Sequence, residues 1–139
     1  MLVLNEDIKT QIIKHAIDEF PNEACGLFSA NSGSSTIACF YPMANVANSG
    51  IIYQLDPLEM MKVEGIADAE EKQIIGVMHS HTHTAAYPSP TDVRDATDFD
   101  PLGTWHYLIV SLQESEPVIR SFRIKNEEIT EEEISFTNS

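Results

Sequence analysis

Two histidines and an aspartate near the middle of the chain have the types and spacing of metal ligands. His79 and His81 follow a short apolar run, Ile74–Met78, which predicts a buried strand. Side chains two positions apart on a strand point the same way, so both imidazoles should face one side of it. Asp92 would add a carboxylate from a following helix folded against the end of this strand. Two imidazole nitrogens and one carboxylate oxygen suit zinc. Three protein ligands leave a fourth position open for water, which distinguishes catalytic from structural zinc sites.

The start of a helix is expected to position the carboxylate. Ser89, Pro90 and Asp92 have the form of an N-cap, a proline at the first helical position and an acidic residue that completes a capping box. This pattern predicts a helix from Pro90 to about Asp98, with Asp92 in its first turn. A serine at an N-cap needs no catalytic duty, so a purely structural interpretation of Ser89 stands beside any functional one.

The spacing of these residues resembles a known family. His79-x-His81, seven residues, then Ser89-x-x-Asp92 is similar to the signature of the JAMM (MPN+) metallopeptidases, a zinc family that includes deubiquitinating isopeptidases. The sequence from His79 to Asp92 is most similar to that of the bacterial Mec-type branch, whose members trim or release cysteine from ubiquitin-like sulfur-carrier proteins. Thr82 stands where many relatives have proline, a departure that bears on the branch and not on the metal.

The resemblance covers nearly the whole chain and implies roles for particular residues. It implies that His79, His81 and Asp92 bind Zn²⁺ and that Ser89 helps to stabilise the oxyanion. The segment Pro21-x-Glu23-x-Cys25-Gly26-Leu27 looks like the family's upstream glutamate segment, which makes Glu23 the general base. Periodicity alone cannot choose among 22 acidic residues, and without the resemblance Glu23 reads as an exposed loop carboxylate.

The remaining histidines have simpler interpretations. His83 would join the other two imidazoles if the strand continued, but the composition of the next residues favours a loop, so we expect His83 in a loop near the substrate groove. His106 has no companion ligands in sequence and is expected to face into the sheet. His15 lies beside a helical apolar stripe and is expected to be structural.

Apolar periodicity and turn residues predict an α/β protein in one domain, residues 1–139. No regular βαβ alternation is present, so we expect a mixed central sheet flanked by helices; the resemblance implies the same, a cytidine-deaminase-like JAMM/MPN sandwich. The expected helices are capped by Asn5, Asp56 and Ser89 and run to about Phe20, Lys72 and Asp98, the second with core positions Leu58, Met60, Met61 and Ile66. The expected strands are a short one ending near Phe28, then Thr36–Tyr41, Ile51–Leu55, Ile74–Met78, Trp105–Ser111 and Val118–Lys125, with residues 127–139 as an edge strand or helix end.

Charge and composition limit the partners. Eight Lys and Arg against 22 Asp and Glu give a net charge of −14, which argues against nucleic acid and anionic membranes, although such a surface also simply favours solubility. The sequence contains no apolar run of membrane-spanning length and no signal-like start, so a cytoplasmic protein is expected. Cys25 and Cys39 are expected to be thiols and not a disulfide.

The resemblance therefore implies a zinc-dependent peptidase or isopeptidase. Its implied substrate is a ubiquitin-like sulfur-carrier protein, cleaved after the C-terminal Gly-Gly to release cysteine or a short extension. A non-catalytic MPN-type scaffold and a more general JAMM isopeptidase are the alternatives. A zinc deaminase would need H-x-E and P-C-x-x-C, and the sequence contains neither. The substrate protein, the metal used in the cell and the oligomeric state, with a homodimer among the options, stay open.

Overall fold

The computed structural model describes residues 1–138. Three helices and eight strands follow one another along the chain, and their bounds are β1 Leu2–Asn5, α1 Glu6–Glu19, β2 Cys25–Asn31, β3 Cys39–Met43, α2 Pro57–Ala69, β4 Lys72–His81, α3 Pro90–Phe99, β5 His106–Ser111, β6 Val118–Lys125, β7 Glu128–Glu132 and β8 Ile134–Thr137.

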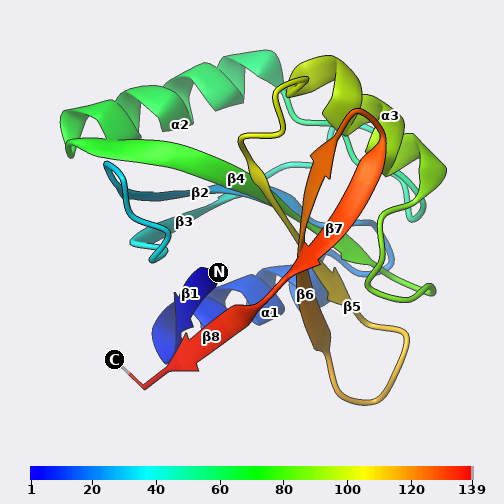
Figure 1. Cartoon of the computed structure of the whole chain (residues 1–139). Coiled ribbons are helices and arrows are strands. Elements are labelled where there is room, and N and C mark those ends of the chain that lie inside the picture. The colour runs from blue at the N-terminus through cyan, green and yellow to red at the C-terminus, as the bar shows by residue number, and fades with distance from the viewer. Residues whose placement is uncertain (139) are drawn as a thin grey trace.

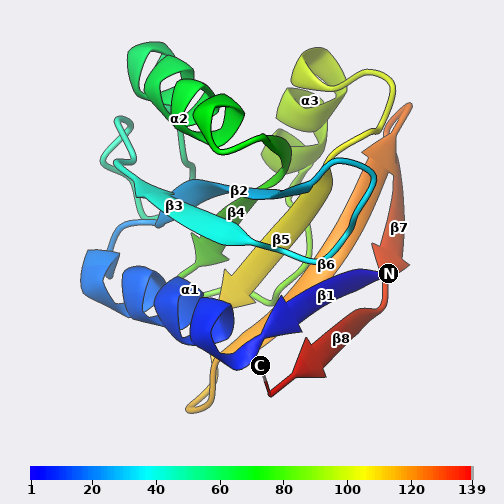
Figure 2. The ribbon, with the colours of Figure 1, turned by 90° about the vertical axis from the view of Figure 1, so that its left-hand side faces the viewer.

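The centre of the fold is a six-stranded mixed sheet with the order β3-β2-β4-β5-β6-β7. β4 and β5 are parallel and are joined through α3, whereas the other neighbours in this sheet are antiparallel. β1 and β8 form a separate parallel pair that brings the two ends of the chain together. α1 covers one face of the sheet, while α2 and α3 cover the other (Figures 1 and 2). The predicted fold class, a mixed sheet flanked by helices, is confirmed.

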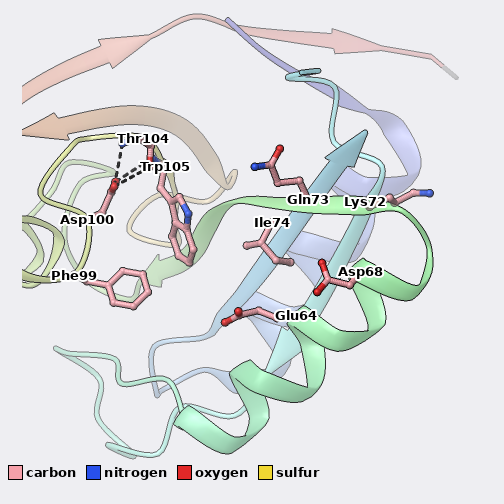
Figure 3. Close-up of a pocket in the computed structure, with 9 residues that line it drawn as sticks. All are labelled: Glu64, Asp68, Lys72, Gln73, Ile74, Phe99, Asp100, Thr104 and Trp105. Atoms are coloured by element: carbon pink, nitrogen blue, oxygen red, sulfur yellow. Dashed lines mark hydrogen bonds between the residues drawn. The ribbon is translucent and has the colours of Figure 1, made fainter. Parts of the chain in front are cut away.

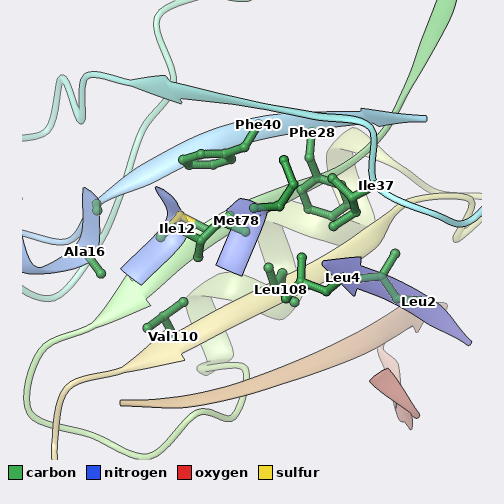
Figure 4. Packing of buried hydrophobic residues seen from close by; sticks show 12 residues of the cluster. Leu2, Leu4, Ile12, Ala16, Phe28, Ile37, Phe40, Met78, Leu108 and Val110 are labelled. Carbon is green, nitrogen blue, oxygen red and sulfur yellow. The ribbon is translucent and has the colours of Figure 1, made fainter. Parts of the chain in front are cut away.

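Each face of the sheet carries its own hydrophobic cluster, because neighbouring residues of a strand point to opposite faces. Met78 and Leu108 belong to the cluster beneath α1 (Figure 4). Val77 and Ile109, their neighbours in sequence, belong to the cluster beneath α2 and α3. His79 follows Val77 by two residues, so the end of β4 presents its histidine to the face that α3 covers.

The helix starts are as the capping residues predicted. The side chains of Asn5, Asp56 and Ser89 each accept a hydrogen bond from a backbone N–H in the first turn of α1, α2 and α3. α2 ends at Ala69, earlier than predicted, because Lys72 already opens β4.

The predicted core face of α2 was wrong. Leu58, Met61 and Ile66 are 72%, 69% and 51% exposed, and Val63 and Ala67 are buried instead, with Met60 packed beside them. Apolar residues lie on both sides of this helix, so its periodicity could not identify the side that faces the sheet.

Two strand predictions also need correction. Ile51–Leu55 is not a strand, because the side chain of Asn45 hydrogen-bonds the backbone of this segment and holds it as an irregular loop. The predicted strand Thr36–Tyr41 begins later, as β3. The sequence analysis did not anticipate β1. At the chain end, β7 is the edge strand that was one of the two expectations for this region, and β8 pairs with β1; Ser139 lies outside the described residues.

Two further observations concern the whole of the described chain. Both cysteines, Cys25 and Cys39, are free thiols, as expected. Among residues 1–138 no helix has the length and apolar character needed to cross a membrane.

Candidate metal centre

The ligand atoms proposed from the sequence meet at one point of the structure. His79 Nε2 lies 3.2 Å from His81 Nε2, and each of these nitrogens lies 3.1 Å from Asp92 Oδ2. All three residues are buried, with 9% exposure or less. The last three residues of β4 supply both imidazoles, and the first turn of α3 supplies the carboxylate.

The geometry of this cluster fits a zinc ion. Zinc bound tetrahedrally at about 2.0–2.1 Å holds its ligand atoms roughly 3.3 Å apart, close to the three separations observed. The carbonyl oxygen of Ala85 can only accept a hydrogen bond, so His81 Nδ1, 2.7 Å away, donates to it. The lone pair of His81 Nε2 therefore faces the cluster. Lone pairs that converge in this way need a proton or a cation between them, and nitrogen and oxygen donors suit zinc.

The capping box at the start of α3 orients Asp92. The backbone N–H of Ser89 donates to Asp92 Oδ2 at 2.9 Å, and Ser89 Oγ accepts from the backbone N–H of Asp92 at 3.1 Å. Burial acts to raise the pKa of Asp92, but the adjacent His79 and His81, which share a proton with the carboxylate when no cation is bound, and the N–H of Ser89 outweigh it. The pKa of this carboxyl is held well below its usual range, so Asp92 is an anion at neutral pH.

Glu23 lies beside this cluster because of the pairing between β2 and β4. Cys25 pairs with His79 in the antiparallel register, and the next residues remain aligned because Ser80 N–H donates to Ala24 O at 3.0 Å. Ser80 Oγ adds a second bond, which it accepts from Ala24 N–H at 2.7 Å. This alignment, continued by one residue on each side, brings Glu23 opposite His81.

The Glu23 carboxylate is buried, in contrast to the exposed loop position that its local sequence alone suggests. It is 4% exposed, and among the described residues no hydrogen-bond partner reaches its Oε1. Burial raises the pKa of Glu23 to about 8; the charge of His81 opposes this shift and that of Asp92 adds to it. A bound cation would favour the ionised form and lower this pKa.

Tyr53 and Asn45 belong to the surroundings of the site, and the sequence analysis did not identify either. The Tyr53 ring stacks on the His79 imidazole, with centroids 4.4 Å apart and an angle of 21° between the planes. Asn45 is buried and donates to the backbone carbonyl of Glu23 at 3.0 Å. No local pattern could have indicated them, because both act across the fold from a segment without regular structure.

The remaining histidines lie away from the ligand cluster. His83 is exposed in the loop after β4, as expected, and packs edge-on against Phe20 with centroids 5.7 Å apart. His106 is buried in β5 and pairs with Glu132. His15 contacts the backbone carbonyls of Cys25 and Met43, which agrees with a structural role.

A cavity of about 480 Å³ lies between α2 and the segment that follows α3 (Figure 3). Ile74 and Trp105 contribute to its walls, and the side chains of Glu64 and Asp68 reach it from α2. It lies near the start of β4, whereas the candidate ligands lie at the strand's end, so it is separate from the metal centre.

Comparison with known proteins agrees with the fold and with the family that the sequence resembles. A family model described as prokaryotic homologs of the JAB domain matches residues 5–125. The CysO-cysteine peptidase of Mycobacterium tuberculosis is 37% identical over 137 residues, which span 97% of this chain and 90% of that protein. A desampylase of Haloferax volcanii is 30% identical over 101 residues, or 69% of this chain and 73% of that protein.

A solved structure is similar throughout its length. The solution structure of protein DSY2949 from Desulfitobacterium hafniense has a TM-score of 0.90 at 34% identity and covers 100% of this chain and 94% of that one. Together with the family match over most of the sequence, this similarity confirms the predicted resemblance: the chain belongs to the JAB-domain family, the JAMM-type group.

Proposed function

We propose that this chain is a zinc-dependent peptidase that cleaves a ubiquitin-like sulfur-carrier protein after its C-terminal Gly-Gly and releases cysteine or a short extension. The observation that carries the proposal is the convergence of three ligand atoms from His79, His81 and Asp92 beside the buried Glu23 carboxylate. The relatives named a CysO-cysteine peptidase and a desampylase support both the reaction and the class of substrate.

His79, His81 and Asp92 would hold the zinc. When bound, the metal would act as a Lewis acid that polarises the substrate carbonyl and acidifies a water. The hydrogen bond from His81 to the Ala85 carbonyl keeps the ligating nitrogen free of its proton, and Ser89 N–H keeps Asp92 turned toward both imidazoles.

Glu23 would serve as the general base and then as the acid. Its carboxylate takes a proton from the attacking water as the new carbon–oxygen bond forms, and donates that proton to the amine as the peptide bond breaks. Such transfer contributes about 10²–10⁴ to the rate. Burial keeps bulk water from this carboxylate, so its proton affinity depends strongly on nearby charge.

Ser89 would stabilise the oxyanion of the tetrahedral intermediate. Its Oγ accepts the bond from Asp92 N–H, which leaves the hydroxyl proton free to donate. The capping role therefore uses a lone pair of Ser89 Oγ, and the catalytic role would use the hydroxyl proton, so one residue can serve both.

The direct test uses a ubiquitin-like sulfur carrier extended by one cysteine after Gly-Gly. Incubation with the zinc-loaded protein should remove one cysteine residue by intact mass, and phenanthroline should abolish the reaction. The Glu23→Gln variant is the matched control, because it retains the metal ligands. No cleavage of the carrier by a zinc-loaded protein would support a binding scaffold, and equal cleavage of unrelated unfolded peptides would support a general peptidase.

A further inference from the structure

The two candidate histidine ligands are held in different ways. A metal-binding histidine usually donates its second ring N–H to an acceptor that fixes the orientation of the ring. His81 has such an acceptor in the Ala85 carbonyl. His79 does not: its Nδ1 is buried, and no protein group within residues 1–138 makes a hydrogen bond with it. A different contact must therefore orient the His79 ring.

The Tyr53 ring makes that contact. It lies nearly parallel to the His79 imidazole, whereas the other ring beside His79, that of His81, meets it at 61° with centroids 5.0 Å apart. A flat ring on one face and an edge on another restrict rotation of the imidazole about its side-chain bond. Stacked aromatic pairs of this kind are worth about 0.5–1.5 kcal/mol beyond the burial of their area.

Tyr53 can restrain His79 only if its own segment is fixed, and Asn45 fixes it. The side-chain amide of Asn45 donates to the carbonyls of Glu23, Ser49 and Ile52 at 3.0, 3.3 and 3.0 Å. Its oxygen accepts from the backbone N–H groups of Ala47 and Gln54 at 3.1 and 3.0 Å. One buried side chain thereby ties both sides of Tyr53 to the residue that we propose as the base.

Two more bonds attach the same segment to the strands that carry the site. Glu23 N–H donates to Ser49 O at 2.8 Å, and Thr82 Oγ1, one residue after His81, donates to Gly50 O at 2.9 Å. The segment from residue 45 to residue 54 therefore bridges the end of β4 and the residues before β2.

We propose that Tyr53 is a positioning residue for the metal centre: its ring orients His79 in place of the missing hydrogen bond, and Asn45 acts through Tyr53 by holding the segment 45–54. The proposal rests on the metal site of the proposed function but not on its peptidase reaction. In this proposal, the irregular segment 45–54 holds a metal ligand in its orientation.

The test is the zinc affinity of the purified, metal-free chain, measured by competition with a chromogenic chelator and without substrate. Tyr53→Leu should raise the Kd for zinc about 10–100-fold, the usual loss when a residue supporting a ligand is removed. Tyr53→Phe keeps the ring and should change the Kd less than about 3-fold. Tyr41→Leu is the matched control, because Tyr41 packs against the same hydrophobic cluster but makes no ring contact with either histidine.

The outcomes separate this inference from the site itself. If Tyr53→Leu binds zinc as tightly as the natural chain, or if Tyr41→Leu weakens binding equally, Tyr53 does not position His79. If Asp92→Ala also leaves zinc binding unchanged, the metal site itself is wrong. Asn45→Ala should weaken zinc binding in the natural chain but have little further effect in Tyr53→Leu; equal effects in both backgrounds would refute action through Tyr53.

Discussion

Within residues 1–138, two buried histidine–carboxylate clusters lie on opposite faces of one sheet, and only one of them has the geometry of a metal site. His79, His81 and Asp92 face α3. His106 and Glu132 lie on the other face, since the register of β5, β6 and β7 aligns them with residues of the α1 side. The histidine–carboxylate pairing and the burial are similar in the two places, so neither feature distinguishes them.

The difference lies in what the polar atoms face. Around Glu132, donors surround one carboxylate: His106 Nδ1 and Ser121 Oγ donate to Oε1, and the N-terminal amine and Arg123 Nη1 lie 3.9 Å from Oε2. Burial acts to raise the pKa of Glu132, but the hydrogen bonds from His106 and Ser121 and the nearby positive charges hold it below its usual value. In the His79 cluster the imidazole Nε2 atoms and the carboxylate oxygen converge on one another. A carboxylate whose oxygens already accept hydrogen bonds, as in Glu132, indicates a structural network. Acceptor atoms that point at one another, as in the His79 cluster, indicate a place for a cation.

The largest expected effect comes from removing a candidate metal ligand. His79→Ala, His81→Ala and Asp92→Ala should each lose zinc and at least about 10³-fold of the peptidase activity, because two remaining ligands hold the metal poorly. Metal content by mass spectrometry of the purified variants is the measurement. His106→Ala, from the other cluster, should retain one zinc per chain. If all three ligand variants kept one zinc per chain, the His79 cluster would not be the metal site and would not differ from the His106 cluster in this respect.

Glu23→Gln should separate the base from the metal. The amide cannot accept a proton, so kcat should fall about 10²–10⁴-fold while zinc content and fold are retained. Near-normal turnover would move the role of base to another carboxylate.

The same variant has an expected effect on stability that depends on pH. The pKa of Glu23 in the metal-free folded chain is raised to about 8 from an ordinary value of 4.5, so the folded state binds the proton more tightly than the unfolded state. The contribution of Glu23 to the stability of the folded chain is therefore lost as pH rises from about 4.5 to about 8, by at most about 1.4 kcal/mol per pH unit. Urea denaturation of metal-free Glu23→Gln should show a smaller loss over this range. An identical pH dependence would contradict a buried, proton-binding Glu23.

His106→Ala should affect stability and not the metal. Removing this donor takes away one of the hydrogen bonds to the Glu132 carboxylate, and losing a hydrogen bond to a charged group costs about 1.5–3 kcal/mol. Denaturant unfolding of the metal-free chain should show this loss, while zinc affinity stays unchanged. A lower zinc affinity would show that the two faces of the sheet are coupled.

The smallest expected effect is at Ser89. Ser89→Ala should cost about 1 kcal/mol of stability through the lost cap and reduce kcat by less than Glu23→Gln does. Ser89→Asn restores a capping oxygen without the hydroxyl, so it should regain most of the stability but not the rate. Full recovery of both would limit Ser89 to the cap, the simpler interpretation of its position.

Local sequence was sufficient where the signal is local. Two histidines on alternate residues of an apolar strand share a face by the geometry of the pleat, and the Ser89, Pro90, Asp92 pattern starts a helix through bonds within four residues. These short-range rules predicted the helix starts and placed the ligands on one side of a strand.

The assignment of a core face to α2 failed for a physical reason. Leu58 and Met61 are as apolar as the residues that α2 buries, and only the position of the sheet decides which side is covered. The predicted strand in 51–55 failed similarly: its apolar side chains suit a strand, but Asn45 takes the backbone groups that a strand partner would need.

The sequence by itself determined the chemistry: which residues can ligate a metal, which can cap a helix, and which family they resemble. Tertiary structure alone decided the surroundings. Glu23 is buried because β2 pairs with β4, and Tyr53 stacks on His79 because a segment without periodicity crosses the end of that strand. Contacts between residues far apart in the chain depend on strand register and packing. The hydrophobic pattern of the residues that make such contacts does not reveal either of these.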